Sequence, residues 1–175
     1  MKDNFAKNVS KAMSGDADAF AQLYSLVYKD LYYIALCNLR NSNDAADVVS
    51  DAVLDAFTSI ANLKNETAFK PWIIKILTIK IKRKQAYIIN YKNNTTELSE
   101  EIEQKSVKNQ DDFVGLEIIE QVNHLNENEK LAFSLSAICG YSSDEISQMT
   151  GINSATVRSH LLRGREKLKQ KLSVE

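Results

Sequence analysis

Glycine and proline, the residues that most often interrupt helices, are scarce in this sequence of 175 residues, which has five glycines and one proline. Because these residues mark most tight turns, their scarcity argues against a fold of many short strands joined by hairpins. Apolar residues instead recur at intervals of three and four along much of the chain, which is the spacing of one helix face. The sequence therefore predicts an all-α protein.

Other absences limit the classes of function. The two histidines, His124 and His160, lie apart in the sequence, and no nucleophile–base pair or metal-ligand spacing accompanies them. We therefore expect no catalytic residue, no metal and no cofactor, and a protein that is not an enzyme. The sequence shows no signal peptide and no apolar run of membrane-spanning length, so we expect no membrane insertion.

Cysteine is also rare, and neither Cys37 nor Cys139 sits in a metal-ligand spacing. Cysteines of this kind are usually buried apolar side chains in a reducing compartment. We therefore expect two free thiols in a cytoplasmic protein.

The net charge of −1 conceals a strong segregation of charge along the chain. Residues 64–92 carry eight basic and one acidic side chain, whereas residues 93–130 carry three basic and ten acidic ones. Residues 131–175 are basic again. Two basic segments separated by an acidic one predict two separate contacts with a polyanion.

The C-terminal basic segment contains the pattern of a helix-turn-helix. Ser142 can cap a first helix, and Glu145 three residues later completes a capping box. Gly151 then supplies the positive φ that ends a helix, and Asn153 or Ser154 caps the second one. The apolar positions of the second helix follow at helical spacing: Val157, Leu161, Leu168 and Leu172.

The outer face of this second helix decides between a DNA reader and a plain helical hairpin. Arginine can bridge the two acceptors of guanine, and serine and histidine can reach base edges or phosphates. The alternative is a solvated helix with basic residues near its C-terminus, where the helix dipole favours them. We prefer DNA binding because the capping box, turn glycine, second cap and basic face coincide. The candidate residues are Ser154, Arg158, Ser159, His160, Leu162 and Arg163.

Two helices are predicted nearer the N-terminus. The first begins near Asp16 or Asp18 and carries an apolar stripe, and the second follows a turn and is capped by Asp44. One side of the second helix can face a core, while another is acidic with interleaved apolar residues. A solvated face and a partner surface explain this acidic side equally well. Its residues are Asp47, Ser50, Asp51 and Leu54.

Two aromatic residues, Phe69 and Trp72, stand beside many basic residues over residues 69–84. Pro71 is tolerated in a helix there if it lies in the first turn. Bases of a single strand can stack on such rings while lysines bind phosphates, although a core position for Trp72 is at least as good an explanation of that residue. The candidates for single-strand contact are Trp72, Lys75, Lys82 and Arg83.

A polar stretch over residues 93–112 predicts a flexible linker between two small helical domains, residues 1–92 and 113–175. A helix is expected over residues 113–125, and Asn126 with Glu129 predicts the start of another. Because the acidic block lies between two basic segments, we also expect a compact free form in which it folds back onto them.

Four motifs, in this order, resemble those of bacterial RNA polymerase sigma factors of the extracytoplasmic-function (ECF) type, over about residues 15–172. Residues 15–24 are similar to the family's opening motif, and residues 44–57 to the helix that docks on the polymerase clamp. Residues 69–84 resemble the helix for promoter melting and minus-ten recognition. Residues 125–172 resemble the domain that reads the minus-thirty-five element.

The resemblance implies a sigma factor that binds core RNA polymerase, promoter DNA as duplex and opened strand, and an anti-sigma factor. It assigns core polymerase binding to the acidic face and upstream-element recognition to the second helix of the helix-turn-helix. The loop over residues 63–69 resembles the one that captures a flipped base, which adds Lys64 and Asn65 to the minus-ten and melting candidates. Residues 1–92 would then be sigma domain two, and residues 113–175 sigma domain four.

Three departures from the family pattern leave alternatives open. Ser50 stands where glutamine is common, Phe57 where tryptophan is common, and Ile79 where an asparagine helps to contact minus-ten DNA. The Ile79 departure fits a degenerate sigma-like protein that only sequesters polymerase or an anti-sigma factor. A stand-alone helix-turn-helix regulator would explain residues 141–172 but neither the acidic helix nor the basic segment.

Overall fold

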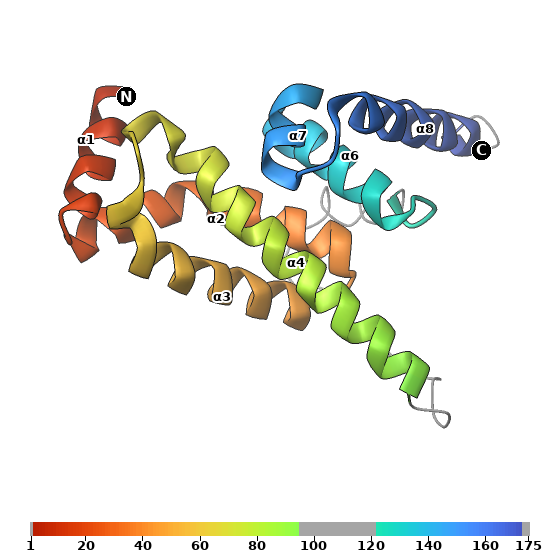
Figure 1. Ribbon diagram of the computed structural model, residues 1–175, viewed down its shortest axis with the longest axis horizontal. Helices are drawn as coiled ribbons and strands as arrows, with labels where there is room; N and C mark the ends of the chain where they lie inside the picture. The colour runs from red at the N-terminus through yellow and green to blue at the C-terminus, as the bar shows by residue number, and fades with distance from the viewer. Residues whose placement is uncertain (1, 95–121, 173–175) are drawn as a thin grey trace.

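The computed structural model describes residues 2–94 and 122–172, and every regular element in these two ranges is a helix (Figure 1). The all-α prediction is therefore confirmed. The helices form an N-terminal body and a C-terminal body. Of the predicted linker, residues 93–112, only the first two residues are described, and they belong to a helix. Most of the helix predicted over residues 113–125 lies outside the described ranges.

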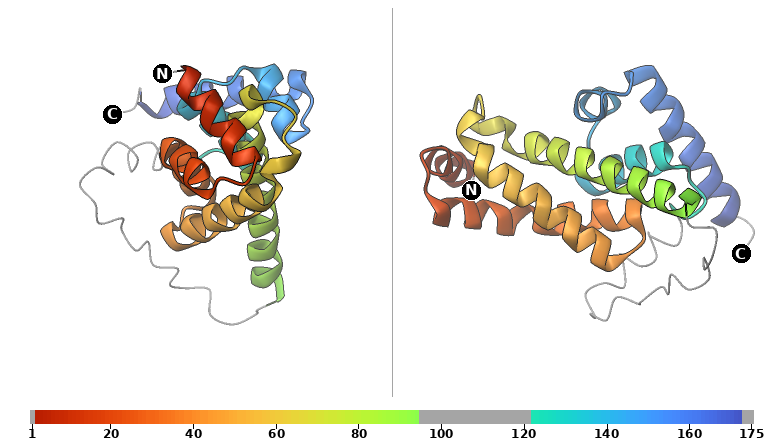
Figure 2. Two further views of the ribbon diagram at one scale, coloured as in Figure 1. Left: turned by 90° about the vertical axis from the view of Figure 1, so that its left-hand side faces the viewer. Right: turned by 60° about the horizontal axis from the view of Figure 1, so that its bottom comes forward.

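The N-terminal body is a bundle in which α2, α3 and α4 pack together and α1 covers one end (Figures 1 and 2). Two short 3-10 turns join α3 to α4 and contact α1. The elements are α1 (Lys2–Met13), α2 (Ala17–Leu39), α3 (Ser42–Ser59), η1 (Ile60–Asn62), η2 (Glu66–Ala68) and α4 (Phe69–Asn94).

Helix α1 was not predicted from the sequence. Its inward positions are Phe5, Val9 and Ala12, which lie four and three residues apart. Three apolar positions in a short helix give a weak periodic signal, and one of them is only an alanine. The ring of Phe5 packs edge-on against Phe69 with 5.9 Å between centroids, so contact with the rest of the body stabilises this helix.

Local capping explains where the next helices begin. Asp16 caps α2, since its carboxylate accepts a hydrogen bond from the backbone N–H of Ala19 at 2.9 Å. The prediction that Asp44 caps α3 is wrong. Asn41 does so instead, accepting from the N–H groups of Asn43 and Asp44 at 2.9 and 3.0 Å. Both residues are good caps, and the chain enters the helix at the earlier one.

The long helix α4 supplies much of the core. Phe69, Ile73, Leu77 and Ile81 follow one another at intervals of four and are fully buried. They pack with apolar residues of α2 and α3 in one continuous cluster. Pro71 lies in the first turn of α4, where its missing N–H leaves no helical bond unmade.

The C-terminal body consists of α6 (Glu127–Cys139), α7 (Ser143–Thr150) and α8 (Ser154–Leu172). Its predicted local signals are confirmed. Asn126 with Glu129 and Ser142 with Glu145 form capping boxes at the starts of α6 and α7. Gly151 ends α7 with a φ of 73°, and Asn153 caps α8 by accepting from the N–H of Ala155 at 2.9 Å.

The two bodies are in contact, with α6 against α2 and α7 against α4 (Figures 1 and 2). We call this contact the seam. Its apolar part includes Cys37 of α2, which is buried together with Val122 and Leu125 of the C-terminal body. Both cysteines are free thiols, Cys37 buried and Cys139 half-buried.

Direct polar contacts also cross the seam. The Asn38 amide donates to the Ser134 hydroxyl at 3.1 Å. The Arg40 guanidinium donates to the backbone carbonyl of Asn123 at 3.0 Å, and the Lys82 ammonium to that of Thr150, also at 3.0 Å. The Thr150 carbonyl is at the C-terminal end of α7, where the helix dipole favours a cation.

None of the helices in the described ranges has the length and apolarity needed to cross a membrane.

Candidate nucleic-acid and polymerase interfaces

The solvent face of α8 carries most of the predicted duplex-binding residues. Arg158, Ser159, Leu162 and Arg163 are exposed, and Leu162 has 59% of its surface accessible. Val157, Leu161 and Leu168 are buried on the opposite side, against the rest of the C-terminal body. Ser154 is half-buried at the first position of the helix. The structure therefore brings these five predicted residues onto one accessible ridge.

His160 does not lie on this ridge, so its predicted position on the outer face is wrong. With about 3.6 residues per turn, a residue three positions after Val157 falls only about 60° from it around the helix. His160 is accordingly buried with Val157 and Leu161, at 9% exposure. Its Nδ1 has no hydrogen-bond partner among the described residues.

The arginines of this ridge are held by neighbouring groups. Arg158 donates from Nη1 to the hydroxyl of Ser154 at 3.1 Å, and the same nitrogen lies 3.7 Å from a carboxylate oxygen of Asp144 on α7. The hydroxyl of Ser154 donates to that carboxylate oxygen. Arg163 donates from Nε to the carbonyl of Ser159 at 3.3 Å.

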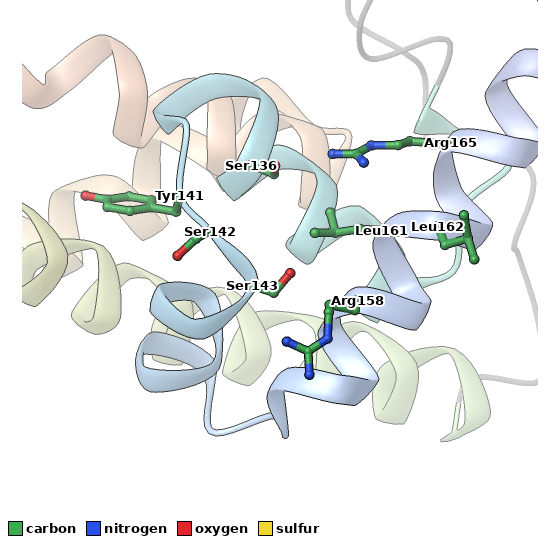
Figure 3. A pocket seen from close by; sticks show the side chains of 8 residues that line it. All are labelled: Ser136, Tyr141, Ser142, Ser143, Arg158, Leu161, Leu162 and Arg165. Atoms are coloured by element: carbon green, nitrogen blue, oxygen red, sulfur yellow. The ribbon is translucent and has the colours of Figure 1, made fainter.

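A groove of about 410 Å³ runs beside the start of α8 (Figure 3). Arg158 and Arg165 of α8 line it together with Leu161, and the start of α7 contributes its cap Ser142 and its first residue Ser143. Arg158 was among the DNA-contact candidates predicted from the sequence, but Arg165, Ser142 and Ser143 were not. Arg165 follows Arg158 at seven residues, two helical turns on, and this spacing was the available signal.

The acidic face of α3 is continuous. Asp47, Ser50, Asp51 and Leu54 are all exposed, at the intervals of three and four that place residues on one side of a helix. The opposite side of α3 is buried in the core. Sequence reasoning did not include Phe57, which extends this face. This residue is 45% exposed, and its ring packs edge-on against Phe20 with 5.1 Å between centroids.

The basic side of α4 carries Lys75, Lys82 and Arg83, all exposed. Ile79 lies among them with 44% of its surface accessible. Trp72 is half-buried, and its ring packs against Phe69 with 6.1 Å between centroids. Trp72 is therefore partly packed in the core and partly accessible for stacking, so the structure agrees with both explanations of this residue.

Not every basic side chain of α4 is directed outward. Lys80 binds Asp55 and Lys84 binds Asp44, each at 2.7 Å, and both partners lie on α3. The hydrogen bond with Asp44 raises the pKa of Lys84. These two lysines fasten α4 to α3.

The loop between η1 and η2 holds the two remaining predicted residues, Lys64 and Asn65, both exposed. The side-chain oxygen Oδ1 of Asn65 is used by the turn itself. It accepts from the Ala68 N–H at 2.9 Å and from the Thr67 hydroxyl at 2.7 Å. Within the described ranges, no group of three or more histidine, cysteine, aspartate and glutamate side chains could hold a metal ion.

Comparison with known proteins identifies the family to which this chain is similar. A family model described as Sigma-70 region 2 matches residues 21–86, which run from α2 into α4. A second, described as Sigma-70, region 4, matches residues 115–168, which include the helix-turn-helix. Together the two matches cover more than half of the chain, in the order of the predicted domains.

Individual relatives agree with this result. The chain is 28% identical to the ECF RNA polymerase sigma factor SigW of Bacillus subtilis, over 95% of each chain. Its fold is similar to that of CnrH solved in complex with the cytosolic domain of CnrY, with a TM-score of 0.72, 19% identity, and coverage of 98% of this chain and 99% of that one. It is also similar to the sigma factor RpoE solved with the anti-sigma factor NepR from Bartonella quintana, with a TM-score of 0.67, 22% identity, and coverage of 89% and 98%.

Sigma factors are transcription initiation factors and not enzymes. On the two matched regions and the relatives that span nearly the whole chain, this protein belongs to the ECF group of the sigma-70 family, and its function is to direct RNA polymerase to promoters.

Proposed function

We propose that this sigma factor divides its work among three separate surfaces, one each on α8, α4 and α3. The observation that carries the proposal is that each surface is exposed while the opposite side of the same helix is buried. Residues 1–92 act as sigma domain two, which binds core polymerase and recognises and melts the minus-ten element. Residues 93–112 join it to sigma domain four, residues 113–175, which recognises the minus-thirty-five element.

The α8 ridge reads the duplex. Arg158 and Arg163 can each bind a guanine edge in the major groove, and the exposed Leu162 can contact a thymine methyl group. Ser154 and Ser159 can bind phosphates or base edges. His160 is left out of this set because its ring is buried.

The acidic face of α3 binds core polymerase. A face made only of carboxylates would fit solvent as well as a partner. Here Leu54 is 61% exposed and Phe57 45% exposed beside Asp47 and Asp51, which is the mixture of apolar anchor and charged rim found in protein interfaces. The exposed apolar side chains favour a partner surface over a solvated face.

The basic side of α4 and the preceding loop engage the opened minus-ten strand. Lys64, Lys75, Lys82 and Arg83 supply positive charge, and the exposed part of Trp72 offers a ring for stacking. Asn65 shapes the loop through its bonds to Thr67 and Ala68.

We further propose an anti-sigma factor as a partner, and action in the cytoplasm, where core polymerase is found. Both structural relatives described above were solved with a bound protein, which is named as an anti-sigma factor in the case of NepR. An anti-sigma factor that favours the closed seam would hold the two DNA-reading surfaces too close together to reach both promoter elements.

The closed seam is not the arrangement that reads both promoter elements. Elements named for positions minus ten and minus thirty-five are about 25 base pairs apart, or roughly 85 Å at about 3.4 Å per base pair. The longest described helix, α4, has 26 residues and spans about 39 Å at 1.5 Å per residue. That is less than half of the separation, and the C-terminal body packs against α2 and α4, so we infer that the seam opens when the protein reads both elements.

Transcription in vitro with core polymerase and a library of promoter fragments tests this assignment. Asp47→Lys with Asp51→Lys should abolish association with core polymerase, because like-charge juxtaposition at an interface costs several kcal/mol. Arg158→Ala with Arg163→Ala should keep that association but lose upstream recognition, by about 1–3 kcal/mol for each guanine contact. Asp18→Lys, a charge reversal at an exposed site on α2, is the control.

Normal capture of core polymerase by the α3 double variant would remove the role of that face. Unchanged promoter selection by the α8 double variant would remove the role of the α8 ridge.

A further inference from the structure

A carboxylate of the first helix of the helix-turn-helix reaches the start of the second. Asp144 lies in the first turn of α7, and its Oδ1 accepts a hydrogen bond from the hydroxyl of Ser154, the first residue of α8. The same oxygen lies 3.7 Å from Nη1 of Arg158, which in turn donates to the Ser154 hydroxyl at 3.1 Å. Three side chains from two helices therefore converge on one another.

This network fixes the direction of Arg158. Ser154 and Arg158 are four residues apart and so lie on the same side of α8. Figure 3 shows the Arg158 side chain directed from α8 toward α7, along the edge of the groove. An unrestrained arginine on a DNA-facing helix can turn toward many phosphates and base edges, because its side chain has large rotamer freedom. Held by Asp144 and Ser154, Arg158 presents its remaining N–H groups in one direction.

We propose that Asp144 is a specificity-determining residue of promoter recognition, which acts by orienting Arg158 through Ser154. This inference rests on the proposed role of the α8 ridge in reading DNA. The carboxylate of Asp144 has two effects. Its charge opposes contact of this region with phosphates of any sequence, and its bonds restrict which base edge Arg158 can reach.

A role in folding is a weaker explanation of the network. The side chains of Arg158 and Asp144 are 62% and 74% exposed, so water screens their attraction. The capping box of α7 is made by Ser142 and Glu145 and does not involve Asp144. Asp144→Asn therefore leaves the caps in place, and thermal unfolding of the variant should match that of the parent protein.

The test uses the full chain bound to core polymerase and promoter fragments in which each upstream base pair is varied singly. Asp144→Asn should raise affinity for fragments lacking the upstream element by about two- to fivefold, the effect expected of one exposed charge interaction. It should also reduce discrimination, by a similar factor, at the base pair that Arg158 reads. Asp144→Glu keeps the charge and should restore part of that discrimination.

A matched control separates orientation from charge. Glu166→Gln removes an exposed carboxylate from α8 itself, two helical turns beyond Arg158. It should raise affinity for all fragments without changing the preference at any single position. If Glu166→Gln changes the base preference as Asp144→Asn does, the effect is one of general charge and the inference is overturned.

A double-mutant cycle with Arg158→Ala completes the test. With Arg158 absent, Asp144→Asn should no longer alter discrimination, because nothing remains to be oriented. An equal change in both backgrounds would overturn the inference while leaving α8 as the reader. If Arg158→Ala alone leaves promoter binding intact, both the inference and the proposed role of Arg158 fail. The two outcomes therefore distinguish failure of the inference alone from failure of the proposed role.

Discussion

The interior of the N-terminal body and the seam between the bodies share one continuous apolar cluster, but the seam also buries polar groups. In the interior, Phe69, Ile73 and Leu77 have no accessible surface, and the hydroxyl of Thr78 donates to the carbonyl of Ile74 at 2.9 Å. This region is apolar, and the Thr78 hydroxyl within it has a hydrogen-bond partner. Opening it would expose hydrocarbon to water along three helices.

The seam buries groups that the interior excludes. Lys130 is only 5% exposed there, and the carbonyl oxygens of the Asn38 and Asn123 side chains are buried without a hydrogen-bond partner in the described ranges. A cavity of about 110 Å³ lies where α2 and α4 meet Cys139 and Tyr141. Burying unpaired polar groups weakens an interface, and interfaces between domains of one chain resemble transient ones. We therefore expect the seam to open at a lower cost in free energy than the interior, although both share the same apolar cluster.

The largest expected effect comes from breaking the interior. Leu77→Ala should lower the free energy of unfolding of the N-terminal body by about 2–5 kcal/mol, because it removes buried methyl groups and leaves a cavity. Urea denaturation measures this. Leu26→Ala, at a leucine that is 61% exposed on α2, should change it by less than about 0.5 kcal/mol. Similar losses in the two variants would contradict the description of the interior.

A smaller effect is expected at the seam. Lys82→Ala with Ser134→Ala removes two hydrogen bonds across it, each contributing about 0.5–1.5 kcal/mol, and should raise the open population roughly tenfold. The unfolding free energy of the N-terminal body should hardly change.

The buried thiol of Cys37 reports this opening. Burial raises its pKa to about 11, so in the closed form it is both covered and protonated. In a Cys139→Ser background, alkylation of Cys37 should be about tenfold faster in the double variant. Lys7→Ala with Ser25→Ala, two exposed sites away from the seam, should leave the rate unchanged. Equal rates in all three proteins would mean that these bonds do not hold the seam.

The smallest expected effect is a pH dependence of the seam. Burial, and then the charge of Arg40, lower the pKa of Lys130 to about 8 in the closed form, against 10.5 for an ordinary lysine, while Glu127 and Cys37 act in the opposite direction. The closed form therefore binds fewer protons than the open form above about pH 8. Closure should strengthen as pH rises through this range, by about fourfold between pH 7 and 8.5 for one proton.

Small-angle scattering of the free protein measures the balance of compact and extended forms. Lys130→Met should remove the strengthening of closure with pH and favour the compact form at pH 7, since the charge of Lys130 is then no longer buried. A wild-type protein that expands between pH 7 and 8.5 would have the opposite linkage and would contradict this account.

The features that sequence predicted well are those decided within a few residues. The capping boxes at Asn126 and Ser142 and the positive φ of Gly151 depend on neighbours three or four positions away. The same local rule failed where two good caps compete, as at Asn41 and Asp44, and where a polar residue lies at the edge of an apolar stripe, as at His160. Exposure of such a residue depends on its angle around the helix more than on its type.

The seam could not be predicted in the same way. Charge segregation predicted a compact free form through the acidic block, but most of that block lies outside the described ranges. The contacts that the structure describes instead join Asn38 to Ser134 and Lys82 to Thr150, which are 96 and 68 residues apart. Neither pair has a local signature, because each depends on how two separately folded bodies meet.

Arg40 affects both the stability of the N-terminal body and the contact between the two bodies. It ends α2 in the left-handed conformation, with a φ of 57°, and its guanidinium reaches across to the carbonyl of Asn123. That backbone conformation costs a non-glycine residue about 1–2 kcal/mol. Glycine here would relieve the strain, but it would also remove the bond to the other body. Selection for a more stable N-terminal body would thus favour glycine at this position, whereas selection for a free protein that stays closed would favour arginine. A single codon can therefore exchange folding stability for ease of opening.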